Sequence, residues 1–214
     1  METHGQGLCM SMSWLRNWCL SKVLLRSPVR PLRLMDKNVS AIFLVSTLFG
    51  LAAGLYDLVF PYYLDSLKVS FKEMGLIFSA AAFATAVLAV FVGAKSDVLG
   101  RKWFYSLSLA VASVATTLTP LLQRVWELML VRMFLGIASS IRESLHPTLI
   151  YDYVRAGFTK LLGRTWGMEQ TASGFGQLLA GMALLAFGFQ GSFLLGGILL
   201  LASFAAFASF YREA

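Results

Sequence analysis

Charged residues are scarce in this sequence, and their scarcity excludes an ordinary soluble domain. Asp, Glu, Lys and Arg make up 14% of the 214 residues, whereas hydrophobic residues make up 57%. Soluble domains carry about one-quarter charged residues and about one-half apolar ones. The composition therefore predicts a membrane protein.

Cysteine is also rare. Cys9 and Cys19 are the only two, and both fall in the basic N-terminal segment, so neither a disulfide framework nor a metal site is predicted. The sequence contains no phosphate loop or nucleotide fingerprint, and we expect no cofactor. An intramembrane enzyme is the alternative from another class. This alternative is disfavoured on two grounds. The Tyr56–Asp57 pair is not accompanied by the second motif, G-x-G-D, that an aspartate-based site would need, and no G-x-S-G motif for a serine-based site occurs.

Long apolar runs are what the sequence has instead. About 20 apolar residues are needed to cross a bilayer core of about 30 Å as a helix. Six stretches reach this length: Val39–Phe60, Met74–Ala94, Trp103–Leu122, Val125–Leu145, Trp166–Phe187 and Gly191–Tyr211. We therefore expect six transmembrane helices.

The basic residues predict the orientation of these helices. The net charge of +7 would suit a nucleic-acid partner, but the bases concentrate in alternate connections. The connections holding few of them contain Lys68, Lys72 and Arg124. By the positive-inside rule, this pattern predicts an integral, multi-pass protein of the plasma or inner membrane with both termini cytoplasmic, and no nucleic-acid partner. The cytoplasmic bases would be Arg16, Lys22, Arg26, Arg30, Arg33, Lys37, Lys95, Arg101, Lys102, Arg155, Lys160, Arg164 and Arg212.

Two regions follow from this distribution. Residues 1–38 form a basic cytoplasmic tail suited to anionic lipid, and residues 39–214 form the transmembrane bundle. Met35 is an alternative start, so the sequence leaves open whether residues 1–38 belong to the native protein.

Spans one and four contain an internal repeat. LFGLAAGLYDLVFPYYL (48–64) aligns without a gap with FLGIASSIRESLHPTLI (134–150). The alignment pairs Gly50 with Gly136, Asp57 with Glu143 and Pro61 with Pro147. Because three helices are duplicated and three is odd, the second copy enters the membrane from the opposite side. The predicted fold is all-α, with two inverted three-helix repeats, an arrangement common in secondary transporters.

The loop between spans two and three carries a recognisable motif. GAKSDVLGRK resembles the G-x-x-x-D-x-x-G-R-K loop of the major facilitator superfamily, and the matching residues are Gly93, Asp97, Gly100, Arg101 and Lys102. The resemblance implies that this cluster latches a cytoplasmic gate. A basic loop that only sets topology is the alternative.

Two charged residues inside spans are candidates for a solute or coupling-ion site. Arg132 lies in LMLVRMFLG, at the family's L-x-x-x-R-x-x-x-G spacing, and Asp57 has the D-x-x-x-P spacing of some drug-exporting members. Charges within a membrane are costly and usually functional. Our hypothesis is that Asp57 and Arg132 meet in a central cavity, with Asp57 binding the proton or cation. An Arg132 that reaches the membrane surface is the alternative.

Other polar residues lie near the cytoplasmic ends of spans four and five. Arg142, Glu143 and Glu169 are assigned to the gate beside Asp97, or alternatively to ion pairs at the membrane surface. His146 precedes Pro147 at the expected helix end, where we expect it to be hydrated.

The remaining candidate residues are glycines and prolines that would act in helix packing or as hinges. ASGFGQLLAG (172–181) departs from the family's antiporter pattern g-x-x-x-G-P-x-x-G-G, because Gln177 replaces the proline and Ala180 a glycine. This departure weakens an antiporter assignment. We assign close helix packing or hinge roles to Gly50, Gly54, Pro61, Gly136, Pro147, Gly176 and Gly181.

The resemblance covers residues 39–211 and implies a secondary transporter that moves a small organic solute by alternating access. Ion or proton coupling and efflux are favoured, and no enzyme activity is expected. Family members have twelve spans and this sequence has six, so the expected partners are membrane lipid, the solute and a second six-helix half. The sequence leaves open a fragment, a half-subunit or a homodimer. A non-transporting membrane scaffold is the alternative function.

Overall fold

The computed structural model divides the chain into two units, residues 1–33 and 34–214. It describes the backbone of residues 37–153 and 157–210, and their side chains except those of 37–38, 88–99, 153 and 210. The predicted tail therefore lies outside the described residues, apart from the backbone of its last two. The described residues all belong to the second unit.

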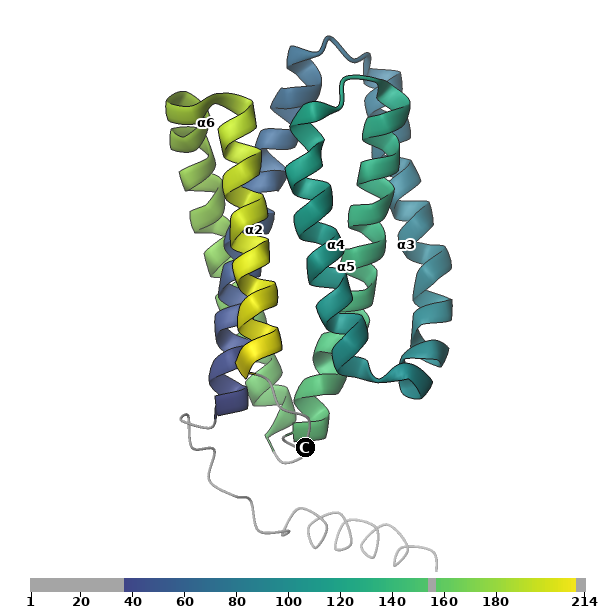
Figure 1. Cartoon of the computed structure of the whole chain (residues 1–214), viewed down its shortest axis with the longest axis vertical. Coiled ribbons are helices and arrows are strands. Elements are labelled where there is room, and N and C mark those ends of the chain that lie inside the picture. The colour runs from purple at the N-terminus through teal and green to yellow at the C-terminus, as the bar shows by residue number, and fades with distance from the viewer. Residues whose placement is uncertain (1–36, 154–156, 211–214) are drawn as a thin grey trace, which may run out of the picture. The chain divides into compact units, whose positions relative to one another are not determined.

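All regular structure in the described ranges is helical (Figure 1). The elements are α2 (Lys37–Ser66), α3 (Phe71–Leu99), α4 (Arg101–Leu118), a short 3₁₀ helix η1 (Thr119–Leu121), α5 (Val125–Tyr153) and α6 (Phe158–Phe210). The α2–α3 turn lies at the upper end of the bundle in Figure 1, and the α3–α4 turn at Gly100 lies at the lower end.

Three helices are long and apolar enough to cross a membrane among the residues that the structure describes. They are Val39–Ser66, Arg101–Leu121 and Phe158–Ser209. The last has 52 residues, which as one straight helix would extend about 78 Å, more than twice the thickness of a bilayer core. The described part of the chain is thus all-α, with three candidate membrane-spanning helices, whereas six spans in inverted repeats stay a prediction.

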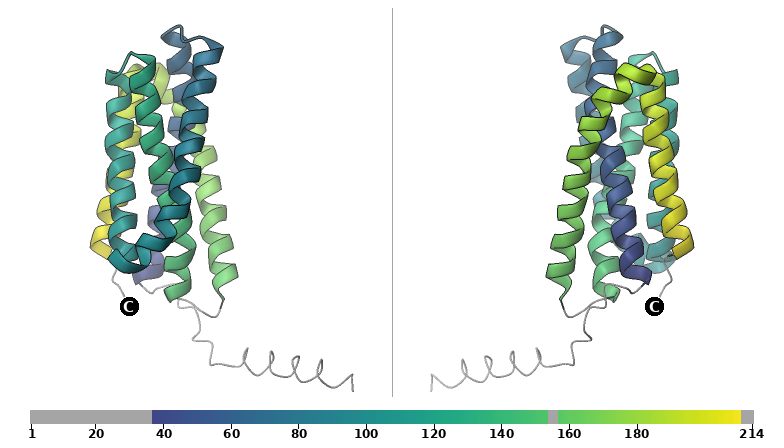
Figure 2. Two further views of the ribbon diagram at one scale, coloured as in Figure 1. Left: turned by 90° about the vertical axis from the view of Figure 1, so that its right-hand side faces the viewer. Right: turned by 90° about the vertical axis from the view of Figure 1, so that its left-hand side faces the viewer.

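Helix α6 is not straight, because its backbone leaves the helical region at Gly188 (φ 65°, ψ −169°). A positive φ of this kind strains residues that carry a Cβ, so glycine suits the position. The chain reverses here, and the two arms of α6 lie antiparallel (Figure 2). The break falls between the predicted spans Trp166–Phe187 and Gly191–Tyr211.

Two predicted helix ends are wrong. We placed the ends of two spans at Phe60 and Leu145, but α2 continues to Ser66 and α5 to Tyr153, with Pro61 and Pro147 inside their helices. Proline removes one backbone N–H donor and breaks helices in water. In membrane proteins it is tolerated inside a helix, because local adjustments and neighbouring groups satisfy the freed carbonyl.

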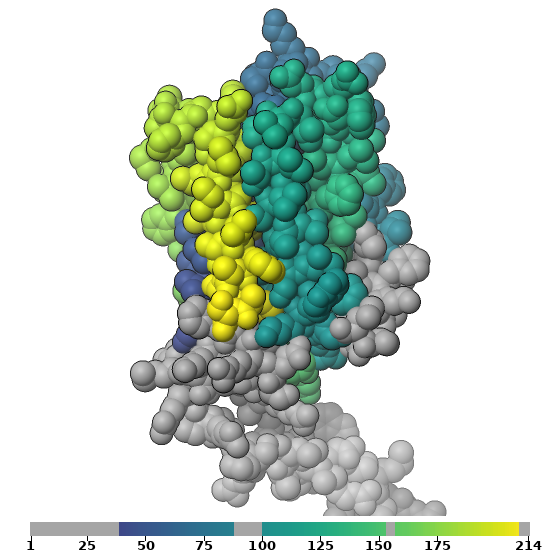
Figure 3. All heavy atoms as spheres, viewed as in Figure 1, coloured from purple at the N-terminus to yellow at the C-terminus, as the bar shows by residue number. Residues whose placement is uncertain are grey.

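The helices pack unevenly, and several pairs touch only slightly. Helix α2 packs mainly on α6, α5 packs on α3 and α4, and α4 packs on α6, whereas α5 and α6 touch only slightly. Figure 3 shows the second arm of α6 beside α4 on one face. An aromatic core joins the C-terminal half of α2 to the second arm of α6, where Tyr56, Phe60, Tyr63 and Phe193 are buried together.

Candidate functional site

A cavity of about 480 Å³ lies among the helices of the bundle. Its wall is formed by residues of α2, α3, α4, α5 and α6, and its volume is typical of sites for small molecules. Five charged side chains line it: Asp57, Arg132, Arg142, Glu143 and Glu169. Among the described residues, no group of three or more His, Cys, Asp or Glu could hold a metal ion.

Asp57 and Arg132 meet in this cavity. Asp57 Oδ1 on α2 lies 3.9 Å from Arg132 Nη2 on α5. This distance allows an ion pair but exceeds that of a hydrogen bond. The Asp57 side chain is 56% exposed and that of Arg132 21%, so the carboxylate is open to the cavity. The interaction that the sequence predicted is therefore present, and the role of the pair stays a proposal.

Aromatic rings surround the Arg132 guanidinium. Its central carbon lies 5.3 Å from the ring centre of Tyr56, 5.2 Å from that of Phe60 and 5.1 Å from that of Phe78. Ring faces attract a cation at such distances. Tyr56 and Phe60 are stacked on α2, and Phe78 of α3 meets Phe60 edge-on. Arg132 is therefore held mainly by rings, with a carboxylate nearby.

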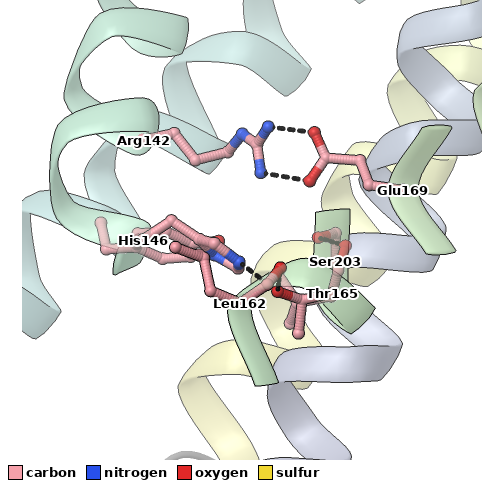
Figure 4. Close-up of polar contacts among 8 residues, drawn as sticks. Arg142, His146, Leu162, Thr165, Glu169 and Ser203 are labelled. Atoms are coloured by element: carbon pink, nitrogen blue, oxygen red, sulfur yellow. Dashed lines mark hydrogen bonds and ion pairs between the residues drawn. The ribbon is translucent and has the colours of Figure 1, made fainter. Parts of the chain in front are cut away.

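Arg142 is held differently, by two hydrogen bonds. Its Nη1 donates to Glu169 Oε2 at 2.9 Å and its Nη2 donates to Glu169 Oε1, as Figure 4 shows. Only 8% and 13% of the two side chains are exposed. The guanidinium also stacks on Phe49, 3.7 Å from the ring centre. This bidentate pair bridges α5 and α6, which otherwise barely touch.

His146 contradicts the expectation that it is hydrated. It is buried, because α5 continues beyond Pro147 and turns the ring towards α4 and α6. Its Nδ1 lies 3.2 Å from the Tyr105 hydroxyl. Its Nε2 lies 3.5 Å from Thr165 Oγ1, as Figure 4 shows. His146 therefore joins three helices in the interior.

The charged loop is only partly described. Gly93 and Asp97 belong to the stretch 88–99, whose side chains lie outside the described residues. Gly100 separates α3 from α4 with a φ of 92°. Arg101 forms an ion pair with Asp152 of α5, and Lys102 is half-buried at the start of α4. The predicted gate residues with described partners thus form two separate ion pairs.

Four of the five predicted packing glycines lie at close helix crossings. A Cβ at each would come within 3 Å of a backbone oxygen on a neighbouring helix, and the four are Gly50, Gly54, Gly136 and Gly176. The closest approach is 2.0 Å, between a Cβ at Gly54 and Ser173 O. A Cβ at Gly181 would meet nothing within 4 Å, so the structure does not support a packing role there.

Sequence reasoning missed several residues of the site. Phe49 and Phe78 stack on the two cavity arginines, Tyr105 and Thr165 contact His146, and Asp152 pairs with Arg101. Only a helical-face argument could have found Phe49, which lies beside Gly50. Nothing in the sequence connects the other four with their partners, which are distant in the chain.

Comparison with known proteins places this bundle in a family. The family model of the Major Facilitator Superfamily matches residues 42–214. An uncharacterized MFS-type transporter of Methanocaldococcus jannaschii is 30% identical over 106 residues, which are 50% of this chain and 28% of that protein. The quinolone resistance protein NorA of Staphylococcus aureus is 26% identical over 146 residues, which are 68% of this chain and 34% of NorA.

These matches cover only about a third of each curated relative. The family model, in contrast, covers most of this chain, including the cavity and both arginine pairs. The chain belongs to the Major Facilitator Superfamily of membrane transporters.

Proposed function

We propose that this chain forms one six-helix half of a secondary active transporter, which moves a small organic solute by alternating access with ion or proton coupling. Membership of the family supports the transport reaction. Helices α2 to α5 and the two arms of α6 are the six proposed spans.

One observation carries the proposal: an open carboxylate and a partly exposed arginine line a cavity inside an apolar helix bundle. Ionisable residues at membrane depth are expensive, and they persist where they face a water-filled path or a substrate. We assign solute or coupling-ion binding to Asp57 and Arg132.

The inverted repeat is supported by the position of its paired carboxylates. Asp57 of α2 and Glu143 of α5 are aligned in the repeat, and both line the same cavity. Each precedes a proline of its own helix by four residues. Binding sites between inverted repeats are the rule in secondary transporters.

The gate is proposed at the lower end of Figure 1, which we assign to the cytoplasm. Arg101, Lys102, Lys160 and Arg164 belong to this end by their positions in α4 and α6. The positive-inside rule then gives both termini to the cytoplasm. We assign the Arg101–Asp152 and Arg142–Glu169 pairs to closing the cavity on this side.

Outward transport of an organic compound is the proposed direction. The D-x-x-x-P spacing at Asp57 favours it, and a relative named for quinolone resistance supports it, because a transporter confers resistance by removing a compound from the cell. We further propose that a second six-helix unit covers the cavity, since charged groups left facing lipid would be costly.

The test is dye transport by the purified assembly in proteoliposomes. We expect ethidium to move in response to a pH gradient, and Asp57→Asn to abolish this response. Asp65→Asn is the matched control, because Asp65 is an exposed acid near the end of the same helix. Wild-type coupling in Asp57→Asn would remove Asp57 from the mechanism.

The mass of the same preparation, measured in detergent, reports how many six-helix units are present. An assembly of at least two units that moves no dye under any gradient would contradict transport and favour a scaffold.

A further inference from the structure

The Arg132 guanidinium occupies a site built to hold a cation. Three rings from two helices stand 5.1–5.3 Å from its central carbon, and the Asp57 carboxylate lies beside it. Aromatic cages with a nearby carboxylate bind quaternary ammonium groups in the same way. Nothing in this arrangement requires that the cation be part of the chain.

The two cavity arginines differ in how firmly they are held. Arg142 makes two hydrogen bonds to Glu169 and is 8% exposed, so displacing it would break a buried bidentate pair. Arg132 stands 3.9 Å from Asp57, too far for a hydrogen bond, and is 21% exposed. Arg132 can therefore leave its rings at a much lower cost.

Resting on the function proposed above, we propose that Tyr56, Phe60, Phe78 and Asp57 form a cage for an organic cation, which Arg132 occupies in this structure and which the transported cation takes over. The exchange leaves Asp57 with a positive partner, because one cation replaces another beside the same carboxylate, and the displaced guanidinium stays tethered to α5. Arg132 then competes with the solute for the cage. When no solute is bound, its guanidinium contacts the rings and pairs with Asp57.

The cage also sets the size of the cation. Tyr56 and Phe60 are buried and stacked on each other, whereas Phe78 is 39% exposed and lines the cavity. Phe78 is thus the most exposed of the three rings. A trimethylammonium head group is compact enough to approach the three rings as the guanidinium does, and larger substituents would extend into the cavity.

Binding of choline to the purified protein in nanodiscs tests the cage, measured by calorimetry. The matched neutral probe is 3,3-dimethylbutan-1-ol, in which carbon replaces the charged nitrogen. We expect Arg132→Ala to bind choline at least tenfold more tightly than wild type, because the competitor is gone. Arg132→Lys should bind as weakly as wild type, because it keeps a tethered cation.

The rings are tested in the Arg132→Ala background. Phe78→Leu should weaken choline binding by about fivefold or more, in line with the loss of one cation–π contact. Phe83→Leu should leave it unchanged, because Phe83 is on the same helix but 73% exposed and outside the cavity. Thermal unfolding of each variant confirms that it is folded.

Two results would overturn the cage. Folded Arg132→Ala could bind choline no better than wild type, or it could bind choline and the neutral alcohol equally. Either result is separable from the proposed transport, since dye flux is measured independently. A protein that binds choline without transporting dye would retain the cage and lose the transport function.

Discussion

The buried pair of Arg142 and Glu169 makes a prediction about stability that can be worked from the geometry. Replacing Arg142 by Gln leaves the Glu169 carboxylate 13% exposed and without its guanidinium, and it removes the stacking on Phe49. Breaking a buried ion pair from one side costs about 3–5 kcal/mol. We expect a loss of this size in the free energy of unfolding.

The expected loss is large enough to measure by thermal unfolding in detergent. For a chain of this length, 1 kcal/mol corresponds to about 2–4 °C in melting temperature, so Arg142→Gln should lower it by about 6–20 °C. Arg124→Gln is the control, because Arg124 is 74% exposed and stands 4.0 Å from Glu127. An exposed pair of this kind contributes about 1 kcal/mol or less.

A double-mutant cycle then separates the interaction between Arg142 and Glu169 from the interactions of each residue with its surroundings. Arg142→Met combined with Glu169→Met removes both charges and should restore most of the stability, because a well-packed apolar pair often replaces a buried ion pair without loss. If the single substitutions cost under about 1 kcal/mol, or if the double variant loses the sum of both, the reasoning that this pair clamps α5 to α6 is refuted.

Three further outcomes are expected. Gly54→Ala should cost about 1–3 kcal/mol of unfolding free energy, because its Cβ would stand 2.0 Å from a backbone oxygen of α6, whereas Gly181→Ala should cost almost nothing; equal melting temperatures would contradict this. Tyr105→Phe should lose about 1 kcal/mol in the same assay, because it removes a hydrogen bond to a buried imidazole, and an unchanged melting temperature would deny that bond. At the start of α3, hydrogen bonds from Ser70 lower the pKa of Glu73 below its ordinary value of 4.5, so this cap contributes stability above that pH and loses it as the pH falls. Ser70→Ala should therefore raise the pKa of the Glu73 carboxyl, measured by NMR titration. An unchanged pKa would rule out the cap.

The contrast between the two arginine pairs bears on function as well as stability. Both arginines lie over aromatic rings in one cavity, but only Arg142 is bound by hydrogen bonds to its carboxylate. A transporter needs a rigid frame and an exchangeable site. Arg142 with Glu169 is the firmly held pair, as a closed gate requires, and Arg132 with Asp57 is the loosely held pair, as an exchangeable site requires.

Part of the candidate site could be found from the sequence. Asp57 and Arg132 were found because a charge in an apolar run is conspicuous. The contacts of His146 could not be predicted in this way, because burial of its ring depends on α5 continuing through Pro147. The packing role predicted for Gly181 is not supported by the structure, because a glycine in an apolar helix does not reveal whether another helix crosses it.

The sequence by itself determined the class of this protein: apolar runs require helices in a bilayer, and a charged glycine-flanked loop indicates the family. Those properties are local, since hydropathy and motif spacing are read along a single stretch of chain. Which side chains share the cavity was decided only by tertiary structure. The rings around Arg132 come from α2 and α3, while the arginine itself comes from α5. Their meeting depends on how the helices cross and rotate, and packing between distant segments sets that geometry.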